Sequence, residues 1–241
     1  MKSNEMTYFG STGKISRILW EGHHICDECR TVILGESHYG DENNSNDKIG
    51  EEVPYSTESV VQGYLDSRSS GTNRKRWYRF FDNIAASFGF LQENSPEFYE
   101  KVWFGNYVPI LCGVKEENRA GQYIKKHRTE YNDALFRFIN ENDIQTVVCF
   151  SKLVYWNLPG GVDGEESKDI LLSSSGERTN AIHVFGYHAG IAHTHCNVEL
   201  KRPLAVYGIR HPSSNWKYDP QKVYDNLSEQ PELKGICWEK K

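Results

Sequence analysis

"TVILGESHYG" (residues 31–40) joins a short apolar run to a glycine and a row of polar side chains. Its aliphatic, β-branched start is typical of a strand that is buried on both faces. The polar residues at its carboxyl end are Glu36, Ser37, His38 and Tyr39. Because ligands of open α/β sheets lie beyond the carboxyl ends of the strands, the stretch predicts a central strand that leads into a functional site.

Three more apolar runs predict buried strands, "FGNYVPI" (104–110), "TVVCFS" (146–151) and "PLAVYGI" (203–209). Helical patterns separate the predicted strands, at 57–67, 74–89 and about 118–142. Strands that alternate with helices indicate a parallel sheet covered on both sides. The fold class we predict is α/β, a three-layer α/β/α sandwich with a central, mainly parallel four-stranded sheet.

Two further segments are less regular. The run "AIHVFGY" (181–187) is compatible with a fifth strand, whereas the polar, glycine-rich stretch 159–180 predicts an excursion from the core. The third predicted strand ends in "SKLVYW" (151–156), where we identify no catalytic group. We find no internal repeat and expect a single domain.

The composition limits the classes of protein to which the chain can belong. Its 241 residues, 38% hydrophobic and 25% charged, suffice for one compact domain. The sequence has no run of 18 apolar residues and no apolar stretch near its start. We therefore expect a soluble, cytoplasmic protein without a membrane partner. We also expect a monomer. The net charge of −5 weighs mildly against nucleic acid, although a local basic face serves an enzyme that visits a polymer.

Ser37 raises the question of a serine hydrolase. A nucleophile elbow has the pattern G-x-S-x-G, in which both glycines allow the sharp turn that exposes the serine. Here Gly35 supplies the first glycine, but Tyr39 stands at the second. A serine hydrolase in which His211 activates Ser37 stays open as an alternative.

Four stretches together are similar to the uracil-DNA glycosylase superfamily, "VILGESHYG", "FGNYVPI", "TVVCFSKLVYWNL" and "VYGIRHPSSNW". In that superfamily a first motif opens with glycine and an acidic or amide residue. A second motif, His-Pro-Ser, precedes a loop that inserts into DNA. The resemblance implies one glycosylase-like domain over residues 1–241 with its core at 31–217.

The first motif departs from the familiar members of this superfamily. Gly35-Glu36-Ser37 matches the opening of the Gly-Glu-x-Pro-Gly motif of the branch that carries an iron–sulfur cluster, but His38-Tyr39 replaces Pro-Gly. The uracil-specific enzymes have Asp-Pro-Tyr-His there, and Ser37 stands in place of the catalytic Asp. The resemblance thus implies a substrate other than uracil. Bulky modified pyrimidines of phage DNA, removed in antiviral defence, are one such class.

Cleavage of an N-glycosidic bond places positive charge on the sugar and negative charge on the departing base. The resemblance implies that the catalytic residues are Glu36, which stabilises the sugar or positions water, and His211, which hydrogen-bonds a base oxygen. It implies that Asn106 reads the base edge and that Tyr39, in preference to Tyr55, stacks on the extruded base. The base-binding residues we expect are Ser37, His38, Tyr39, Asn106 and Tyr107.

The expected partner is DNA. Ser213 and Ser214 would hold phosphate, and Asn215-Trp216 occupies the loop that wedges into the base stack in relatives. A basic stretch precedes the second predicted helix, with Arg74, Lys75 and Arg76 preceded by Arg68. These cations would contact the phosphate backbone, with a solvated helix start as the alternative.

"HHICDECR" contains Cys26-x-x-Cys29, a spacing suited to a metal. Relatives with a four-iron cluster have such a pair and two later cysteines; Cys112 fits the third, but His127 stands near the fourth. Three alternatives stay open, an iron–sulfur cluster, a zinc ion held with His23 or His24, or no metal. The bond cleavage itself requires no cofactor.

The sequence therefore predicts a DNA glycosylase that flips a modified or deaminated base and leaves an abasic site. Besides the serine hydrolase, the alternative is a DNA- or base-binding module of the same fold without catalysis.

Overall fold

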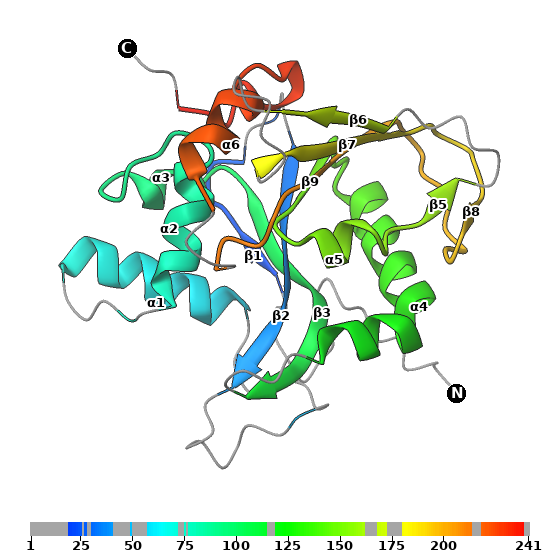
Figure 1. Ribbon diagram of the computed structural model, residues 1–241, viewed down its shortest axis with the longest axis horizontal. Helices are drawn as coiled ribbons and strands as arrows, with labels where there is room; N and C mark the ends of the chain where they lie inside the picture. The colour runs from blue at the N-terminus through cyan, green and yellow to red at the C-terminus, as the bar shows by residue number, and fades with distance from the viewer. Residues whose placement is uncertain are drawn as a thin grey trace.

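The computed structural model describes residues 19–25, 27, 30–40, 49, 57–71, 75, 77–114, 119–161, 168–172, 180–213 and 218–238. Within them a seven-stranded sheet has the order β1-β3-β2-β4-β9-β7-β6 (Figure 1). Its strands are β1 (Trp20–Glu21), β2 (Thr31–Gly40), β3 (Trp103–Val114), β4 (Thr146–Cys149), β6 (Lys168–Leu171), β7 (Ile182–Tyr187) and β9 (Leu204–Gly208). A separate two-stranded ribbon pairs β5 (Gly160–Gly161) with β8 (His193–Thr194).

The α/β class predicted from the sequence is confirmed, but the prediction of a four-stranded sheet is wrong. The four predicted strands, β3, β2, β4 and β9, are parallel neighbours at the centre. At the edges β1 pairs antiparallel with β3, and β7 and β6 continue antiparallel beyond β9. β1 has two residues, too few for a recognisable sequence pattern. β6 lies in the polar stretch 159–180 and was missed, because an edge strand needs little apolar surface.

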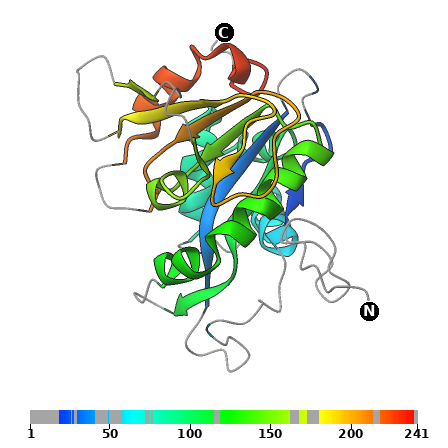
Figure 2. The ribbon, with the colours of Figure 1, turned by 90° about the vertical axis from the view of Figure 1, so that its right-hand side faces the viewer.

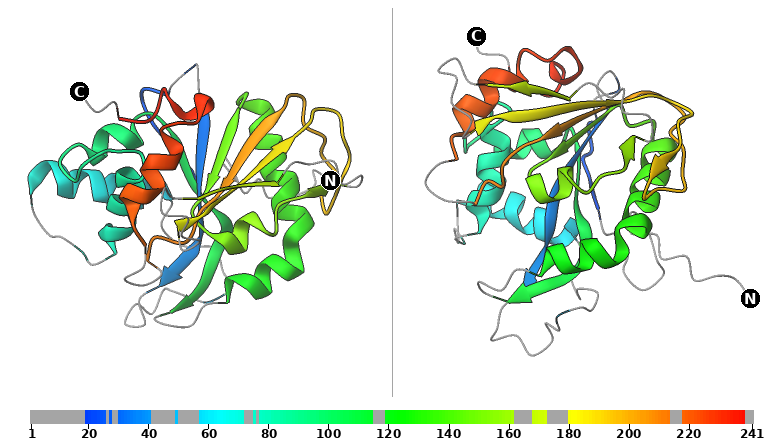
Figure 3. Two further views of the ribbon diagram at one scale, coloured as in Figure 1. Left: turned by 45° about the horizontal axis from the view of Figure 1, so that its top comes forward. Right: turned by 45° about the vertical axis from the view of Figure 1, so that its right-hand side comes forward.

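Helices cover both faces of the sheet (Figure 2, Figure 3). One face carries α1 (Thr57–Ser70), α2 (Tyr78–Ala86), α3 (Ser95–Tyr99) and α6 (Pro220–Leu227), and the short turn η2 (Pro231–Leu233) follows α6. The other carries α4 (Ala120–Glu141) and α5 (Lys152–Tyr155). β2 serves both cores by strict alternation, since Val32 and Leu34 pack toward α4 and Ile33 packs toward α2. All three are fully buried, as expected for a central strand.

The order of the strands creates a switch point between β2 and β4. The chain leaves β2 through α1, α2 and α3 on one face to reach β3, and leaves β3 through α4 on the other face to reach β4. In open sheets, ligands bind beyond the carboxyl ends of strands at such a point.

β2 and β3 continue together past this point with an irregular register. The pairing shifts after Ser37 and again after His38, which leaves Pro109 and Ile110 of β3 without partners. A bulge suits Pro109, because proline has no N–H for the ladder. The shifts re-aim the side chains at the end of β2.

Among the described residues, no helix is long and apolar enough to cross a membrane.

Candidate functional site

Glu36 is held across the switch point by two hydroxyl groups. Ser151 Oγ donates to Oε2 at 2.7 Å, and Tyr39 Oη donates to Oε1 at 3.0 Å. Ser151 lies two residues beyond the end of β4 and caps α5, where its Oγ also accepts from the Val154 N–H at 3.4 Å. An ionised carboxylate only accepts hydrogen bonds, so two donors suit that form and fix its orientation.

His211 follows β9 at the same edge of the sheet. Its ring lies 5.1 Å from that of Phe80 on α2, and its Nδ1 accepts the Ser213 N–H at 3.2 Å. Burial lowers the pKa of His211, while the nearby Glu36 carboxylate opposes this effect. The imidazole is therefore neutral near pH 7. Because Nδ1 acts as an acceptor, the ring proton lies on Nε2, which can donate a hydrogen bond.

Asn106 lies on β3 opposite Gly35 of β2. A Cβ atom at position 35 would be 2.3 Å from Asn106 Oδ1, so the amide occupies space that only glycine leaves open. Asn106 Nδ2 lies 3.3 Å from His38 Nε2, and Thr57 Oγ1 lies 3.4 Å from the same nitrogen. Burial lowers the pKa of His38 to about 4, which makes this histidine neutral as well.

Ser37 lies within β2, not at a strand-to-helix turn. Its side chain is buried, near the Tyr39 phenol and the Cys112 thiol. Its Oγ forms no hydrogen bond of ordinary geometry with any residue that the structure describes. A serine nucleophile needs a base within hydrogen-bonding distance, so this arrangement disfavours a serine hydrolase.

Tyr107 lies apart from these residues. Its side chain is fully buried against α4, and its hydroxyl donates to Asn132 Oδ1 at 2.7 Å. The structure thus gathers Glu36, Tyr39, Asn106 and His211 at the strand ends and places Tyr107 in the core. Tyr55 lies outside the described residues.

Sequence reasoning missed Ser151, Thr57 and Phe80. Ser151 could have been found by taking the first polar side chain after each apolar run, because it directly follows the run 146–150. Phe80 could not, because an apolar residue of an amphipathic helix carries no sign of which strand end it reaches.

Pro212 and Tyr218, on either side of residues 214–217, contact α2 and the residue that follows it. Asn83 Nδ2 donates to the Pro212 carbonyl at 3.2 Å, and the Ser87 hydroxyl lies 2.5 Å from that of Tyr218. Ser213, just before this segment, is exposed. The predicted DNA-binding residues that lie outside the described residues are Ser214, Asn215 and Trp216.

The basic stretch is described only in part. Arg74 and Arg76 lie outside the described residues. Lys75 places its Nζ 5.6 Å from the centre of the Trp77 ring, a cation–π contact at the surface. Arg68 instead forms an ion pair with Asp82 and is largely buried. Its guanidinium therefore serves the packing of α1 on α2.

Cys26 and Cys29 lie outside the described residues. Within the described ranges, no group of three or more His, Cys, Asp or Glu side chains is arranged to hold a metal. Cys112 is buried, which raises the pKa of its thiol to about 11. His23 Nδ1 lies 2.6 Å from Glu100 Oε2, and His127 Nδ1 lies 2.9 Å from Glu130 Oε2.

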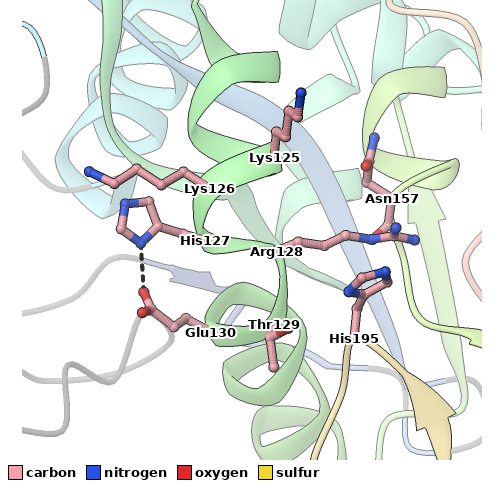
Figure 4. Close-up of a pocket in the computed structure, with 8 residues that line it drawn as sticks. All are labelled: Lys125, Lys126, His127, Arg128, Thr129, Glu130, Asn157 and His195. Carbon is pink, nitrogen blue, oxygen red and sulfur yellow. Dashed lines mark hydrogen bonds and ion pairs between the residues drawn. The ribbon is translucent and has the colours of Figure 1, made fainter.

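A hollow of about 410 Å³ lies where α4 kinks at His127 (Figure 4). It is lined by Lys125, Lys126, His127, Arg128, Thr129, Glu130, Asn157 and His195. Arg128 is engaged structurally, since it donates to the carbonyls of Asn157 and Leu158 at 2.8 and 2.9 Å. The side chains of α4 fan out in different directions instead of converging on one point. The strand ends are therefore the stronger candidate site.

Compared with known proteins, the sequence matches no protein-family model and no curated protein significantly.

Proposed function

We propose that this protein is a DNA glycosylase that hydrolyses the N-glycosidic bond of a flipped, modified or deaminated base. The observation that carries the proposal is the Glu36 carboxylate, held by Ser151 and Tyr39 at the switch point, with a neutral His211 close enough for its pKa to respond to that carboxylate. The resemblance of the strand-end motifs to the uracil-DNA glycosylase superfamily supports the same proposal.

The two side chains match the two charges of the reaction. As the bond between C1′ and the base nitrogen breaks, the sugar becomes positive and the base leaves with the electron pair. Glu36 stabilises the cation and orients a water molecule, whose oxygen bonds to C1′ while its proton passes to the carboxylate or solvent. His211 Nε2–H donates to a base oxygen on which negative charge develops.

Asn106 and Phe80 would hold the base. The amide presents a donor and an acceptor, which suits a Watson–Crick edge. The Phe80 ring packs against that of His211 and lies near Gly35, so we assign the stacking role to Phe80. Tyr39 instead positions Glu36 through its hydroxyl.

The substrate class follows from Ser37. A serine cannot supply the carboxylate that uracil-specific enzymes place there, which supports a base other than uracil. Bulky modified pyrimidines of phage DNA, removed in antiviral defence, are the class we propose beside deaminated bases.

The test is incubation of the purified protein with DNAs that contain uracil, hypoxanthine, hydroxymethylcytosine or its glucosylated form. Alkali then reveals abasic sites as strand breaks. We expect breaks with at least one DNA, loss of more than 100-fold in rate for Glu36→Gln, and unchanged rate for Glu93→Gln, an exposed control. Intact strands throughout, with retained DNA binding, would favour the non-catalytic module and overturn the proposal.

A further inference from the structure

Trp156 is a large exposed aromatic residue beside the candidate site. It follows α5 directly, and 51% of its surface is accessible. Its ring meets that of His183 on β7 edge-on, with centroids 4.8 Å apart, and His183 also lies 5.8 Å from Tyr155. The Trp156 ring is therefore held in place by a neighbour while much of it stays open to solvent.

Lys152 lies near His183, and Arg210 lies near Lys152. Burial and the charge of Arg210 lower the pKa of Lys152, and burial and the charge of Lys152 lower that of His183. None of the ion pairs found among the described residues involves the Lys152 ammonium or the Arg210 guanidinium. The two positive charges repel each other, and an anion placed between them would relieve the repulsion.

Both cations adjoin the catalytic pair in the chain. Lys152 directly follows Ser151, whose hydroxyl binds Glu36, and Arg210 directly precedes His211. β4 and β9 are neighbouring parallel strands, so their carboxyl ends bring these residues to one edge. The surface thus begins at the site of bond cleavage and extends to Trp156.

We propose that Lys152, Arg210 and Trp156 form a binding surface for an unpaired nucleotide next to the flipped one, so that single-stranded DNA is the preferred substrate. This inference rests on the proposed glycosylase function and extends it. The phosphate lies between the two cations, and the neighbouring base stacks on Trp156. In a duplex that base is already stacked and paired, which leaves no face for the indole.

The test measures fluorescence anisotropy with a labelled oligothymidine and the matching duplex. We expect Trp156→Ala to weaken single-strand binding about tenfold and duplex binding less than about twofold. Trp156→Phe retains a ring and should restore most of the affinity. Leu91→Ala, which alters another exposed apolar side chain, should have no effect.

The cations are tested by salt. Lys152→Ala and Arg210→Ala should each weaken single-strand binding. Each should also reduce the slope of log affinity against log salt concentration by about 0.7, the value for one phosphate contact on a single strand. Lys234→Ala, at an exposed lysine, is the control. Circular dichroism confirms that each variant is folded.

Equal losses of single-strand and duplex binding in Trp156→Ala, or no loss, would overturn this inference. Its failure is distinguishable from failure of the proposed function. Base release by the wild type with unchanged binding by Trp156→Ala overturns the binding surface alone. Selective loss of single-strand binding in a protein that releases no base supports the surface and overturns the glycosylase.

Discussion

The Ser151 hydroxyl lies 2.7 Å from Glu36 Oε2, although the two residues are 115 positions apart in the chain. Both side chains are buried, so the bond forms away from bulk water and joins the segment after β4 to the middle of β2. Hydrogen bonds to a charged group in such surroundings are stronger than average. This bond and the one from Tyr39 therefore constrain where the carboxylate points.

Ser151→Ala should reduce the rate of base release about 10- to 100-fold, because a lost hydrogen bond to a charged group is worth about 1.5–3 kcal/mol. Tyr39→Phe should act in the same direction but less, since Tyr39 is partly exposed. Single-turnover rates at saturating DNA measure the effect, and DNA affinity should stay unchanged. Ser69→Ala, at an exposed position of α1 whose hydroxyl donates to the Leu65 carbonyl, is the control. Equal rates for Ser151→Ala and Ser69→Ala would argue against a positioning role.

Gly35→Ala should lower the free energy of unfolding by about 1–3 kcal/mol, because the new Cβ would lie 2.3 Å from Asn106 Oδ1. In an Asn106→Ala background the same change should cost less than about 1 kcal/mol. Urea denaturation measures both steps. Gly186→Ala, where a Cβ meets nothing within 4 Å, is the control strand glycine. The same loss in both backgrounds would show that the amide is not the obstacle.

The stability of the fold should fall as the pH drops from about 6.5 to about 4. Burial lowers the pKa of His38 from 6.5 to about 4, so the unfolded chain takes up a proton first. Above pH 6.5 His38 is neutral in the folded and unfolded chain, so its burial carries no protonation penalty. As the pH falls to about 4, the free energy of unfolding decreases by about 3 kcal/mol. Burial of His211 acts in the same direction.

Urea denaturation across this pH range measures the effect of His38. In His38→Gln, the free energy of unfolding should depend less on pH between 6.5 and 4, whereas exposed His188→Gln should follow the wild type. Identical pH profiles for all three proteins would contradict a neutral, buried His38.

Asp82→Ala should lower the free energy of unfolding by about 3–5 kcal/mol, because it leaves the buried Arg68 guanidinium without its carboxylate. Asp82 also accepts the Tyr64 hydroxyl at 2.8 Å. Asp82→Asn keeps an acceptor for that hydroxyl and should lose less. Thermal and urea unfolding measure the losses, and Asp225→Ala on the surface of α6 is the control. A loss below about 1 kcal/mol would show that Arg68 finds another partner.

Part of the fold could be predicted because its causes are local. β4, β9 and the first half of β2 are mostly aliphatic and β-branched, which is the mark of a strand buried on both faces. β6 and β1 carry no such mark, because they lie at the sheet edges. Their pairing is determined by the strand beside them, which a single sequence does not reveal.

The candidate site likewise contains residues that local sequence could identify and others that depend on tertiary packing. Glu36 and His211 were singled out because each lies in a motif that follows an apolar run and resembles the glycosylase superfamily, and the structure brings the two near each other. Tyr107 was grouped with the site because it follows Asn106, yet adjacent residues of a strand point to opposite faces. The contact between Asn83 and Pro212 depends on how α2 packs, so no local pattern could announce it.

The position of β9 has a consequence for the order of folding. β9 pairs with β4 on one side and with β7 on the other, and it delivers His211 from late in the chain to a carboxylate carried by the first parallel strand. Parallel pairing between distant segments is slow, because a long loop must close before any contact forms. A folding intermediate that contains β2, β3 and β4 would already have the Ser151–Glu36 bond but not the His211 imidazole. The docking of β9 is therefore the step at which the fold would gain its last central parallel strand and bring His211 to Glu36.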